Sequence, residues 1–194
     1  MQFRGLWVSL IIVVAASFTV LIYFGNDIYR MKPPIPSEVA TADGKVLFTA
    51  SDIQDGQNVW QSTGGQQLGT VWGHGSYSAP DWSADWLHRE AESLLNRWAK
   101  QDHAVDDYHK LTAEQLGALK ARLKKELRTN TYDPVTGKIT VSNIRAKAIA
   151  EVQQHYETLY SGSPELADLR DAYAIPSNVL PDPERRRKLT AFYF

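Results

Sequence analysis

The longest apolar stretch of the chain lies near its start. Residues 6–24 read LWVSLIIVVAASFTVLIYF and contain no charged side chain. As a helix they would extend about 28 Å at about 1.5 Å per residue, which matches the hydrocarbon core of a bilayer. Trp7 and Tyr23 lie near the two ends, where aromatic rings favour the headgroup region. The pattern predicts a transmembrane anchor at residues 1–30.

A cleaved signal peptide is the alternative interpretation of this stretch. The apolar run is longer than the usual core of a signal peptide, and no small-x-small cleavage site precedes Asn26. We therefore predict that the anchor is retained. Arg4 on one side of the run faces Arg30 and Lys32 on the other, so the local charges do not decide its orientation.

Beyond the anchor, the pattern changes to proline and then to helical periodicity. Residues 32–36 read KPPIP, which favours a stiff extended spacer over residues 31–38. Alternating segments around Asp43-Gly44 and at residues 132–141 predict small hairpins. Apolar residues at helical spacing dominate the remainder, so we predict a mainly α domain over residues 39–194. Its expected helices lie at about residues 51–60, 80–98, 112–127, 144–159 and 182–194.

Several helix starts carry capping signals. Ser51 is followed three residues later by Gln54, and Thr112 by Gln115, which is the capping-box pattern. An Asp-Pro pair at residues 182–183 predicts the start of a terminal helix. The sequence stops at Phe194 while that helix is still apolar, so we expect either a truncated polypeptide or an end buried against something else.

Composition removes several classes of function. The 194 residues hold 21 Lys and Arg against 22 Asp and Glu, for a net charge of -1. This balance argues against nucleic acid as a partner, and it describes a near-neutral domain rather than a basic, lipid-binding one. Because cysteine is absent, disulfides, thiolate metal sites, cysteine nucleophiles and thioether attachment of haem are excluded. The two methionines, Met1 and Met31, offer no buried axial ligand for haem iron.

Motifs of common catalytic sites are absent from the sequence. None of the five histidines belongs to an H-E-x-x-H motif, and we interpret His88 with Glu92 as part of a solvated helix face. The glycines of residues 64–75 fit neither a nucleophile elbow nor a phosphate-binding loop. The basic run at residues 185–188 is compatible with anionic lipid or an acidic partner, but we favour a solvated helix face.

One segment resembles a known family. Residues 55–90 read DGQNVWQSTGGQQLGTVWGHGSYSAPDWSADWLHRE and resemble the N-terminal part of quinol-dependent nitric oxide reductases. These are bacterial integral-membrane enzymes of the haem-copper oxidase superfamily. The resemblance extends through the anchor, the spacer and the terminal PDPERRRKLTAFYF, and GHGSYSAP at residues 73–80 is its most specific part.

The resemblance implies a fold similar to the small cytochrome c subunit of cytochrome-dependent nitric oxide reductases. In that small protein, the pattern G-x-x-x-W is followed by C-x-x-C-H. Residues 56–60 supply the first pattern, whereas Gly65 to Gly69, where the second is expected, contain neither cysteine nor histidine. The implied domain is therefore a cytochrome c-like helical domain without haem, which has no ligands for a redox centre. We expect aromatic side chains, Trp72 or others among the six tryptophans, to fill the space of the haem.

The resemblance also implies a shared calcium site. In the small cytochrome c protein, the segment G-E-G-A-Y-x-A-P provides a backbone carbonyl and a tyrosine hydroxyl to calcium. The matching positions here are Gly75 and Tyr77, while His74 replaces the acidic residue. Two neutral oxygens do not suffice for calcium, so carboxylates and haem propionates would come from the catalytic portion. The alternative is a structural glycine turn with Tyr77 packed at an interface.

For the whole enzyme, the resemblance implies reduction of two NO to N2O and water with electrons from quinol. Haem b and non-haem iron belong to the catalytic portion, and no catalytic residue is expected in this chain. The expected partners are the lipid bilayer and a multi-helix catalytic membrane core, which lies in the same polypeptide or in a separate one. A homodimer is also compatible with the resemblance. The expected location is the bacterial inner membrane, with the domain on the periplasmic side. The alternative is a single-pass anchored interaction module of the cell envelope without catalytic activity.

Overall fold

The computed structural model describes residues 3–31 and 33–194, which fall into two compact units. The first unit comprises residues 1–34 and the second residues 35–194. Met1 and Gln2 of the expected anchor, and Lys32 of the expected spacer, lie outside the described residues.

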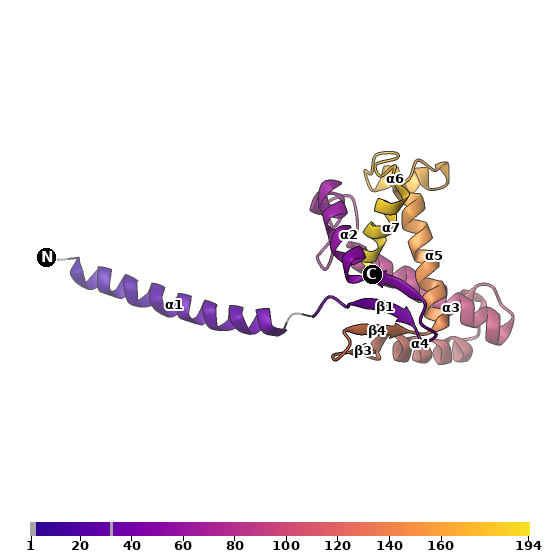
Figure 1. Ribbon diagram of the computed structural model, residues 1–194, viewed down its shortest axis with the longest axis horizontal. Coiled ribbons are helices and arrows are strands. Elements are labelled where there is room, and N and C mark those ends of the chain that lie inside the picture. The colour runs from indigo at the N-terminus through magenta and orange to yellow at the C-terminus, as the bar shows by residue number, and fades with distance from the viewer. Residues whose placement is uncertain (1–2, 32) are drawn as a thin grey trace. The chain divides into compact units, whose positions relative to one another are not determined.

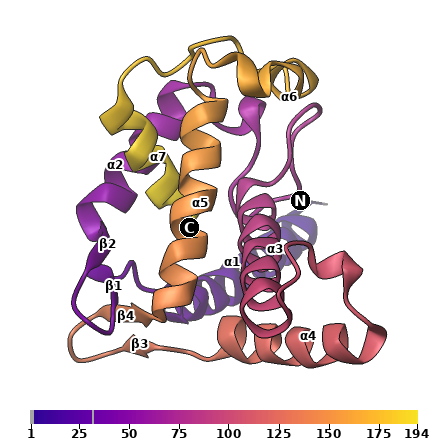
Figure 2. The ribbon, with the colours of Figure 1, turned by 90° about the vertical axis from the view of Figure 1, so that its right-hand side faces the viewer.

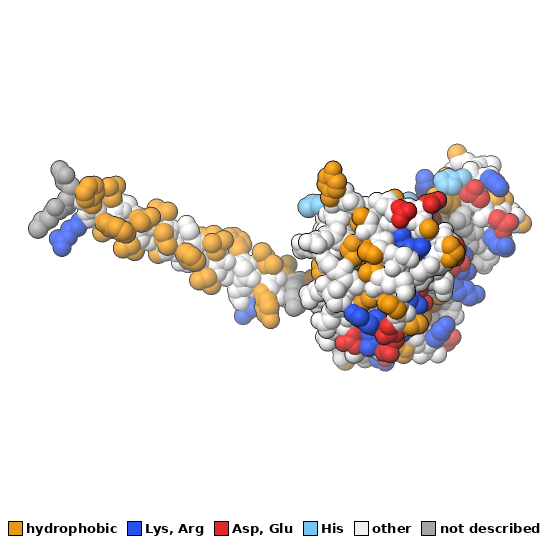
Figure 3. Space-filling view, turned by 90° about the horizontal axis from the view of Figure 1, so that it is seen from above, with side chains coloured by type: hydrophobic (Ala, Val, Ile, Leu, Met, Phe, Trp, Pro, Cys, Tyr) orange, Lys and Arg blue, Asp and Glu red, His pale blue; other side chains and the backbone are white. Residues whose placement is uncertain are grey.

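The first unit contains one long helix, α1 (Arg4–Met31), in which no residue is buried. Its surface carries hydrophobic side chains along its length (Figure 3). The helix is long and apolar enough to cross a membrane, although a signal sequence meets the same criterion. The expectation of one apolar N-terminal helix is thus confirmed, and the helix extends beyond the predicted run at both ends.

The second unit is mainly helical and contains one small sheet (Figure 1). This confirms the predicted fold class. Two short helices late in the chain were not expected: α6 and a 3-10 turn at Pro164–Leu166 that precedes it. The elements of this unit are β1 (Glu38–Thr41), β2 (Val46–Thr49), α2 (Ala50–Ser62), α3 (Trp82–His103), α4 (Ala113–Arg128), β3 (Tyr132–Asp133), β4 (Lys138–Val141), α5 (Asn143–Leu159), α6 (Ala167–Ala172) and α7 (Pro183–Tyr193).

The two predicted hairpins form, and they join into one four-stranded sheet of order β2-β1-β4-β3. Gly44 and Gly137 adopt positive φ angles of 87° and 70°, which glycine accepts without the steric penalty of a side chain. Strands β1 and β4 pair in parallel, with Val39 opposite Ile139. Local sequence predicts each hairpin but not this pairing, because its partners lie about a hundred residues apart in the chain.

The start of α2 differs from the prediction. Thr49, not Ser51, caps the helix: its side chain accepts a hydrogen bond from the backbone N–H of Asp52 at 3.2 Å. The Asp52 carboxylate accepts in return from the backbone N–H of Thr49 at 3.0 Å. Two capping-box patterns overlap in this sequence, and the first prevails because β2 delivers Thr49 in an extended conformation.

Helices α2 and α7 lie side by side, although they are far apart in the sequence (Figures 1 and 2). Gly56 faces α7 so closely that an added Cβ would overlap the carbonyl oxygen of Lys188 and lie 2.8 Å from the Cβ of Phe192. The glycine of the G-x-x-x-W pattern therefore permits the close contact of the two backbones.

The basic run of α7 is not a solvated face and not a free lipid-binding patch. Arg187 pairs with Asp52 at 2.7 Å, and Lys188 pairs with Asp55 at 3.0 Å. Arg185 donates to the hydroxyl of Ser62 at 2.7 Å, and Arg186 donates to the carbonyl oxygen of Pro181 at 2.9 Å. The run is committed to α2 and to the loop before α7, so the preference for a solvated face was wrong.

Aromatic side chains form the centre of the main core. Trp86 stacks on Tyr156 with ring centroids 5.6 Å apart, and Trp82 stacks on Tyr193 at 5.5 Å. Both tryptophans are at most 2% exposed. The Tyr160 and Tyr193 hydroxyls share a hydrogen bond of 2.8 Å, so these buried polar atoms are satisfied. A second, smaller core is formed by α3, α4 and α5 and contains Leu94, Leu95, Trp98, Ala99, Leu119 and Ala148.

His155 makes the stability of this domain depend on pH. Burial, together with the nearby positive charge of Arg89, lowers the pKa of His155 to about 4. The unfolded chain would bind this proton near pH 6.5, so the unfolded state binds more protons between pH about 4 and 6.5. Stability is therefore expected to fall as the pH drops from about 6.5 toward about 4. Urea unfolding of the detergent-solubilised chain at several pH values should show this slope, and His155→Phe should reduce it; an unchanged slope would exclude His155 as its source.

Candidate functional site

The segment that carries Gly75 and Tyr77 is the loop of residues 69–81, which precedes α3. The two ends of the loop pair with each other. The backbone N–H of Trp82 donates to the carbonyl oxygen of Thr70 at 2.8 Å, and the N–H of Thr70 donates to that of Pro80 at 3.3 Å. The loop thus leaves the domain and returns at nearly the same point.

Asp81 organises the loop and also caps α3. Its carboxylate accepts hydrogen bonds from the Thr70 hydroxyl at 3.1 Å, from the Gly73 N–H, and from the N–H groups of Ser83 and Ala84 at 2.9 and 3.2 Å. Burial disfavours the charged form, but these hydrogen bonds outweigh burial and lower the pKa of Asp81. The sequence predicts a helix from about residue 80, and Asp81 lies at its start. The ionised Asp81 carboxylate accepts these hydrogen bonds, and they hold the loop in a fixed shape.

Gly75 lies in this loop at φ +81°, a conformation that favours glycine. Its N–H donates to the Thr70 hydroxyl at 2.8 Å, and an added Cβ would approach the carbonyl oxygen of Ala79 to 3.2 Å. Both the φ angle and the close neighbour therefore select glycine here. The expected glycine turn is present, whatever else the residue does.

The tip of the loop presents aromatic side chains to the outside. Tyr77 is fully exposed, and Trp72 is 90% exposed. Trp72 has a positive φ of 55°, which is uncommon for a bulky residue, and its N–H donates to the Ser83 hydroxyl at 2.9 Å. The expectation named Trp72 or other tryptophans as interior side chains. Trp72 is excluded, because the loop turns its ring outward, whereas Trp82 and Trp86 are buried in the main core.

Calcium ligation by this loop alone is not supported by the geometry. Within the described residues, 3–31 and 33–194, no three or more His, Asp or Glu side chains are grouped so that they could hold a metal ion. Asp81 lies close by, but its oxygens already accept four hydrogen bonds. The loop can offer the neutral oxygens of Gly75 and Tyr77, and calcium needs six to eight oxygen ligands. These two residues alone therefore do not make a complete calcium site.

A short 3-10 turn, Gly65–Leu68, occupies the position where the resemblance places C-x-x-C-H. Gly64 and Gly69 flank it at φ +117° and +107°. The indole N–H of Trp60 donates to the carbonyl oxygen of Gly69 at 3.2 Å. An added Cβ on Gly69 would overlap the indole nitrogen of Trp82. This segment is packed against tryptophan rings, and none of its side chains is a ligand for haem iron.

A cavity of about 450 Å³ adjoins the loop. Trp72 and Trp86 both line it, and so does the buried carboxylate of Glu90. Glu90 accepts hydrogen bonds from the indole N–H of Trp86 at 3.2 Å and from the Nε of Arg145 at 2.5 Å. The sequence does not reveal this ion pair, since Arg145 lies on another helix. Arg145 compensates the charge of the carboxylate, and the rings of Trp72, Trp86 and Phe194 form part of the cavity wall.

The histidines do not gather into a metal site among the described residues. His88 and Glu92 form an exposed pair at 3.5 Å on α3, as predicted for a solvated helix face. His74 lies within the loop itself and is exposed. The described residues therefore provide no imidazole cluster of the kind that binds zinc or iron.

The fold defines a mainly helical, cytochrome c-like domain joined to an apolar helix. Residues 36–194 match the family described as the NorB cytochrome c-like domain of nitric oxide reductase. Because the match covers most of the chain, the chain belongs to this family. No curated protein matches the chain. Membership associates the chain with nitric oxide reductase, an oxidoreductase.

Proposed function

We propose that this chain is the N-terminal portion of a quinol-dependent nitric oxide reductase. In this proposal α1 anchors it in the bacterial inner membrane, and the globular domain lies on the periplasmic side. The whole enzyme converts two NO and one quinol to N2O, water and quinone. The observation that carries the proposal is a domain of the cytochrome c-like family in which the turn Gly65–Leu68 replaces the haem-binding motif.

The absence of haem ligands supports a direct supply of electrons from quinol. A cytochrome c domain transfers electrons through an iron held by axial ligands and thioether bonds. This sequence has no cysteine, and a turn without histidine stands at the motif. The electrons must therefore reach haem b and non-haem iron in the catalytic portion by another route, and a membrane-soluble quinol is such a donor. The domain then acts as a structural cap on the catalytic core.

The same proposal assigns the Gly75 carbonyl and the Tyr77 hydroxyl to a shared calcium site. Uncharged carbonyl and hydroxyl oxygens are ligands of the kind that calcium accepts, and Tyr77 is free to reach a partner surface. The hydrogen bonds to Asp81 hold the loop before binding, which reduces the entropy lost on assembly. When bound, calcium would supply positive charge between the domain and acidic groups of the catalytic portion. No step of the NO chemistry requires these residues.

Replacing Tyr77 by phenylalanine tests this proposal in the complete gene product, including any part encoded after residue 194. The variant should retain less calcium after dialysis against a mild chelator, because one oxygen ligand is lost. We expect the calcium affinity to fall about tenfold and quinol-driven NO consumption to fall with it. Metal analysis and an NO electrode give the two readings.

Tyr132→Phe provides a matched control, because it removes a hydroxyl from β3, outside the loop. It should leave calcium content and NO consumption unchanged. Unchanged calcium in the Tyr77 variant would remove Tyr77 from the site. A gene product with no quinol-driven NO consumption would contradict the proposed enzyme and favour the anchored interaction module.

A further inference from the structure

The charges of the globular domain are segregated, although their sum is near zero. Helix α4 carries five basic and two acidic residues. Lys120, Lys124 and Arg128 follow one another at intervals of four, so they share one face of the helix, and Lys125 is adjacent to it. All four side chains belong to exposed residues. The outer face of α4, defined by these four residues, is therefore a cationic strip.

No acidic residue of the described chain neutralises this strip. None of the ion pairs within residues 3–31 and 33–194 includes any of its four members. Like charges four residues apart destabilise a helix, so the strip opposes the folding of α4. The basic run of α7 differs, because Arg187 and Lys188 pair with α2. The counter-ions of the α4 strip must come from outside the described chain.

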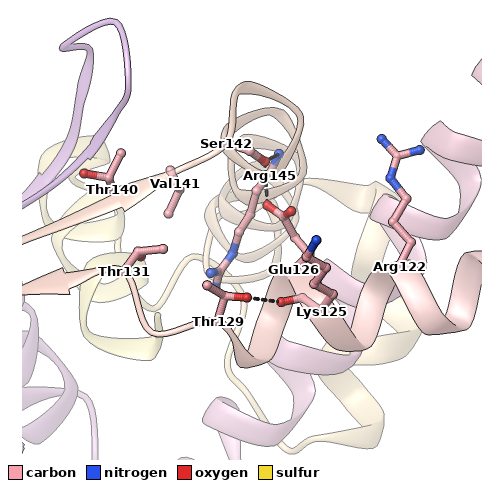
Figure 4. Close-up of a pocket in the computed structure, with 9 residues that line it drawn as sticks. All are labelled: Arg122, Lys125, Glu126, Thr129, Thr131, Thr140, Val141, Ser142 and Arg145. Atoms are coloured by element: carbon pink, nitrogen blue, oxygen red, sulfur yellow. Dashed lines mark hydrogen bonds between the residues drawn. The ribbon is translucent and has the colours of Figure 1, made fainter.

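A hollow of about 430 Å³ lies beside the strip, between α4, the sheet and the start of α5 (Figure 4). Three of its four charged groups are already engaged, and the fourth is Lys125 of the strip. Arg122 pairs with Asp102 at 3.2 Å, Arg145 pairs with Glu90 at 2.5 Å, and Glu126 accepts from the Ser142 hydroxyl. Apart from Lys125, the unpaired cations thus lie on the outer face of α4 and not in the hollow. This distribution favours an extended anionic surface over one bound anion.

The chain enters the globular domain at the β3–β4 hairpin, which follows α4 in the sequence. The N–H of Ser37 donates to the carbonyl oxygen of Gly137 at 2.7 Å, and its hydroxyl donates to that of Thr136 at 3.0 Å. These residues form the turn between β3 and β4, the hairpin that follows α4 along one edge of the domain (Figure 2). Only residues 32–36 separate the end of α1 from Ser37, a distance of at most about 20 Å for an extended chain.

We propose that the outer face of α4 binds the anionic phospholipid headgroups of the bilayer that holds α1. Each Lys or Arg held near an anionic bilayer gains electrostatic stabilisation, and the short tether keeps the local lipid concentration high. Lysine ammonium groups suit a layer of mobile headgroups, because they act as point charges without a fixed bidentate geometry. This inference rests on the membrane anchorage in the proposed function and not on NO reduction.

The test uses residues 1–194 in nanodiscs of phosphatidylcholine, with or without phosphatidylglycerol. Acetylation of individual lysines is followed by mass spectrometry. Labelling of Lys120, Lys124 and Lys125 should slow at least about threefold in the anionic discs. Salt at about 0.5 M should remove the difference by screening. Lys45 and Lys147 serve as controls, since both are exposed and unpaired in other parts of the domain.

Two charge variants complete the test. Replacing Lys120, Lys124 and Arg128 together by glutamine should reduce the effect of anionic lipid on the labelling of Lys125. Replacing the same three residues by glutamate should abolish that effect. Far-ultraviolet circular dichroism verifies that both variants fold. Equal labelling of the wild-type strip in both kinds of disc would overturn the proposal. Protection that appears only after the catalytic portion is added would also overturn it, in favour of an acidic protein surface. Failure of the chain to remain in either disc would instead contradict the membrane anchorage.

Discussion

Replacing Trp86 by alanine is expected to destabilise the globular domain by about 3–5 kcal/mol. The Trp86 ring is 2% exposed and stacks on Tyr156, so its loss opens a large cavity in the main core. The substitution also removes the indole N–H that donates to the buried carboxylate of Glu90. An acceptor left with fewer partners in a buried site adds to the loss. Chemical unfolding of the detergent-solubilised chain, followed by tryptophan fluorescence, measures the effect.

Trp72→Ala is the matched control for this substitution. It removes the same side chain from the exposed loop, where the ring is 90% exposed, so the expected change is within about 0.5 kcal/mol. A near-neutral Trp86→Ala, or equal losses for the two variants, would contradict the placement of Trp86 in the core. The comparison therefore tests the burial pattern independently of function.

Gly56→Ala is expected to destabilise the domain by about 3 kcal/mol through the contact of α2 with α7. Alanine normally favours a helix over glycine by about 1 kcal/mol, so propensity alone predicts the opposite sign. The added methyl group, however, would overlap the carbonyl oxygen of Lys188 and force the two backbones apart. That shift would also weaken the ion pair of Arg187 with Asp52. Urea unfolding monitored by circular dichroism gives the free energy of unfolding.

Gly117→Ala separates steric overlap from helix propensity. Gly117 lies on α4, and no neighbouring atom lies within 4 Å of an added Cβ. The free energy of unfolding of this variant should therefore rise by up to about 1 kcal/mol. We expect the free energy of unfolding to fall in Gly56→Ala and to rise in Gly117→Ala. A stabilised Gly56→Ala would show that α2 and α7 do not approach as closely as the structure has them.

The sequence predicted elements whose signals are local. Thr112 with Gln115 forms the expected capping box, and Asp182 caps α7 before Pro183. The hairpin at Asp43-Gly44 also forms, because its turn needs only one residue with positive φ. Each of these signals lies within four residues, so no distant partner is needed to interpret it.

Features that depend on distant residues were not predicted. Nothing near Arg145 in the sequence indicates that it pairs with Glu90, and nothing near Arg187 indicates Asp52. Trp72 and Trp82 look alike in composition, yet the hydrogen bonds of an irregular loop turn the first outward while α3 carries the second inward. Total charge likewise concealed the cationic strip, because acidic residues elsewhere in the chain offset it in the sum.

In the candidate site, too, local features were predicted and long-range contacts were not. Gly75 and Tyr77 came from the family resemblance, and the structure adds that Gly75 lies in a turn at positive φ while Tyr77 is exposed. Asp81 lies where the sequence predicts a helix to begin, but its bonds to Thr70 and Gly73 follow from loop geometry that sequence patterns do not encode. The role of Gly75 and Tyr77 in calcium binding stays a prediction.

Haem titration of residues 1–194 in detergent tests the central claim most directly, namely that this cytochrome c-like domain holds no redox cofactor. The account predicts that added haem gives only the Soret spectrum of free haem in the same detergent, with no haem retained after gel filtration. A stable one-to-one complex with the shifted Soret band of axially ligated iron would contradict it.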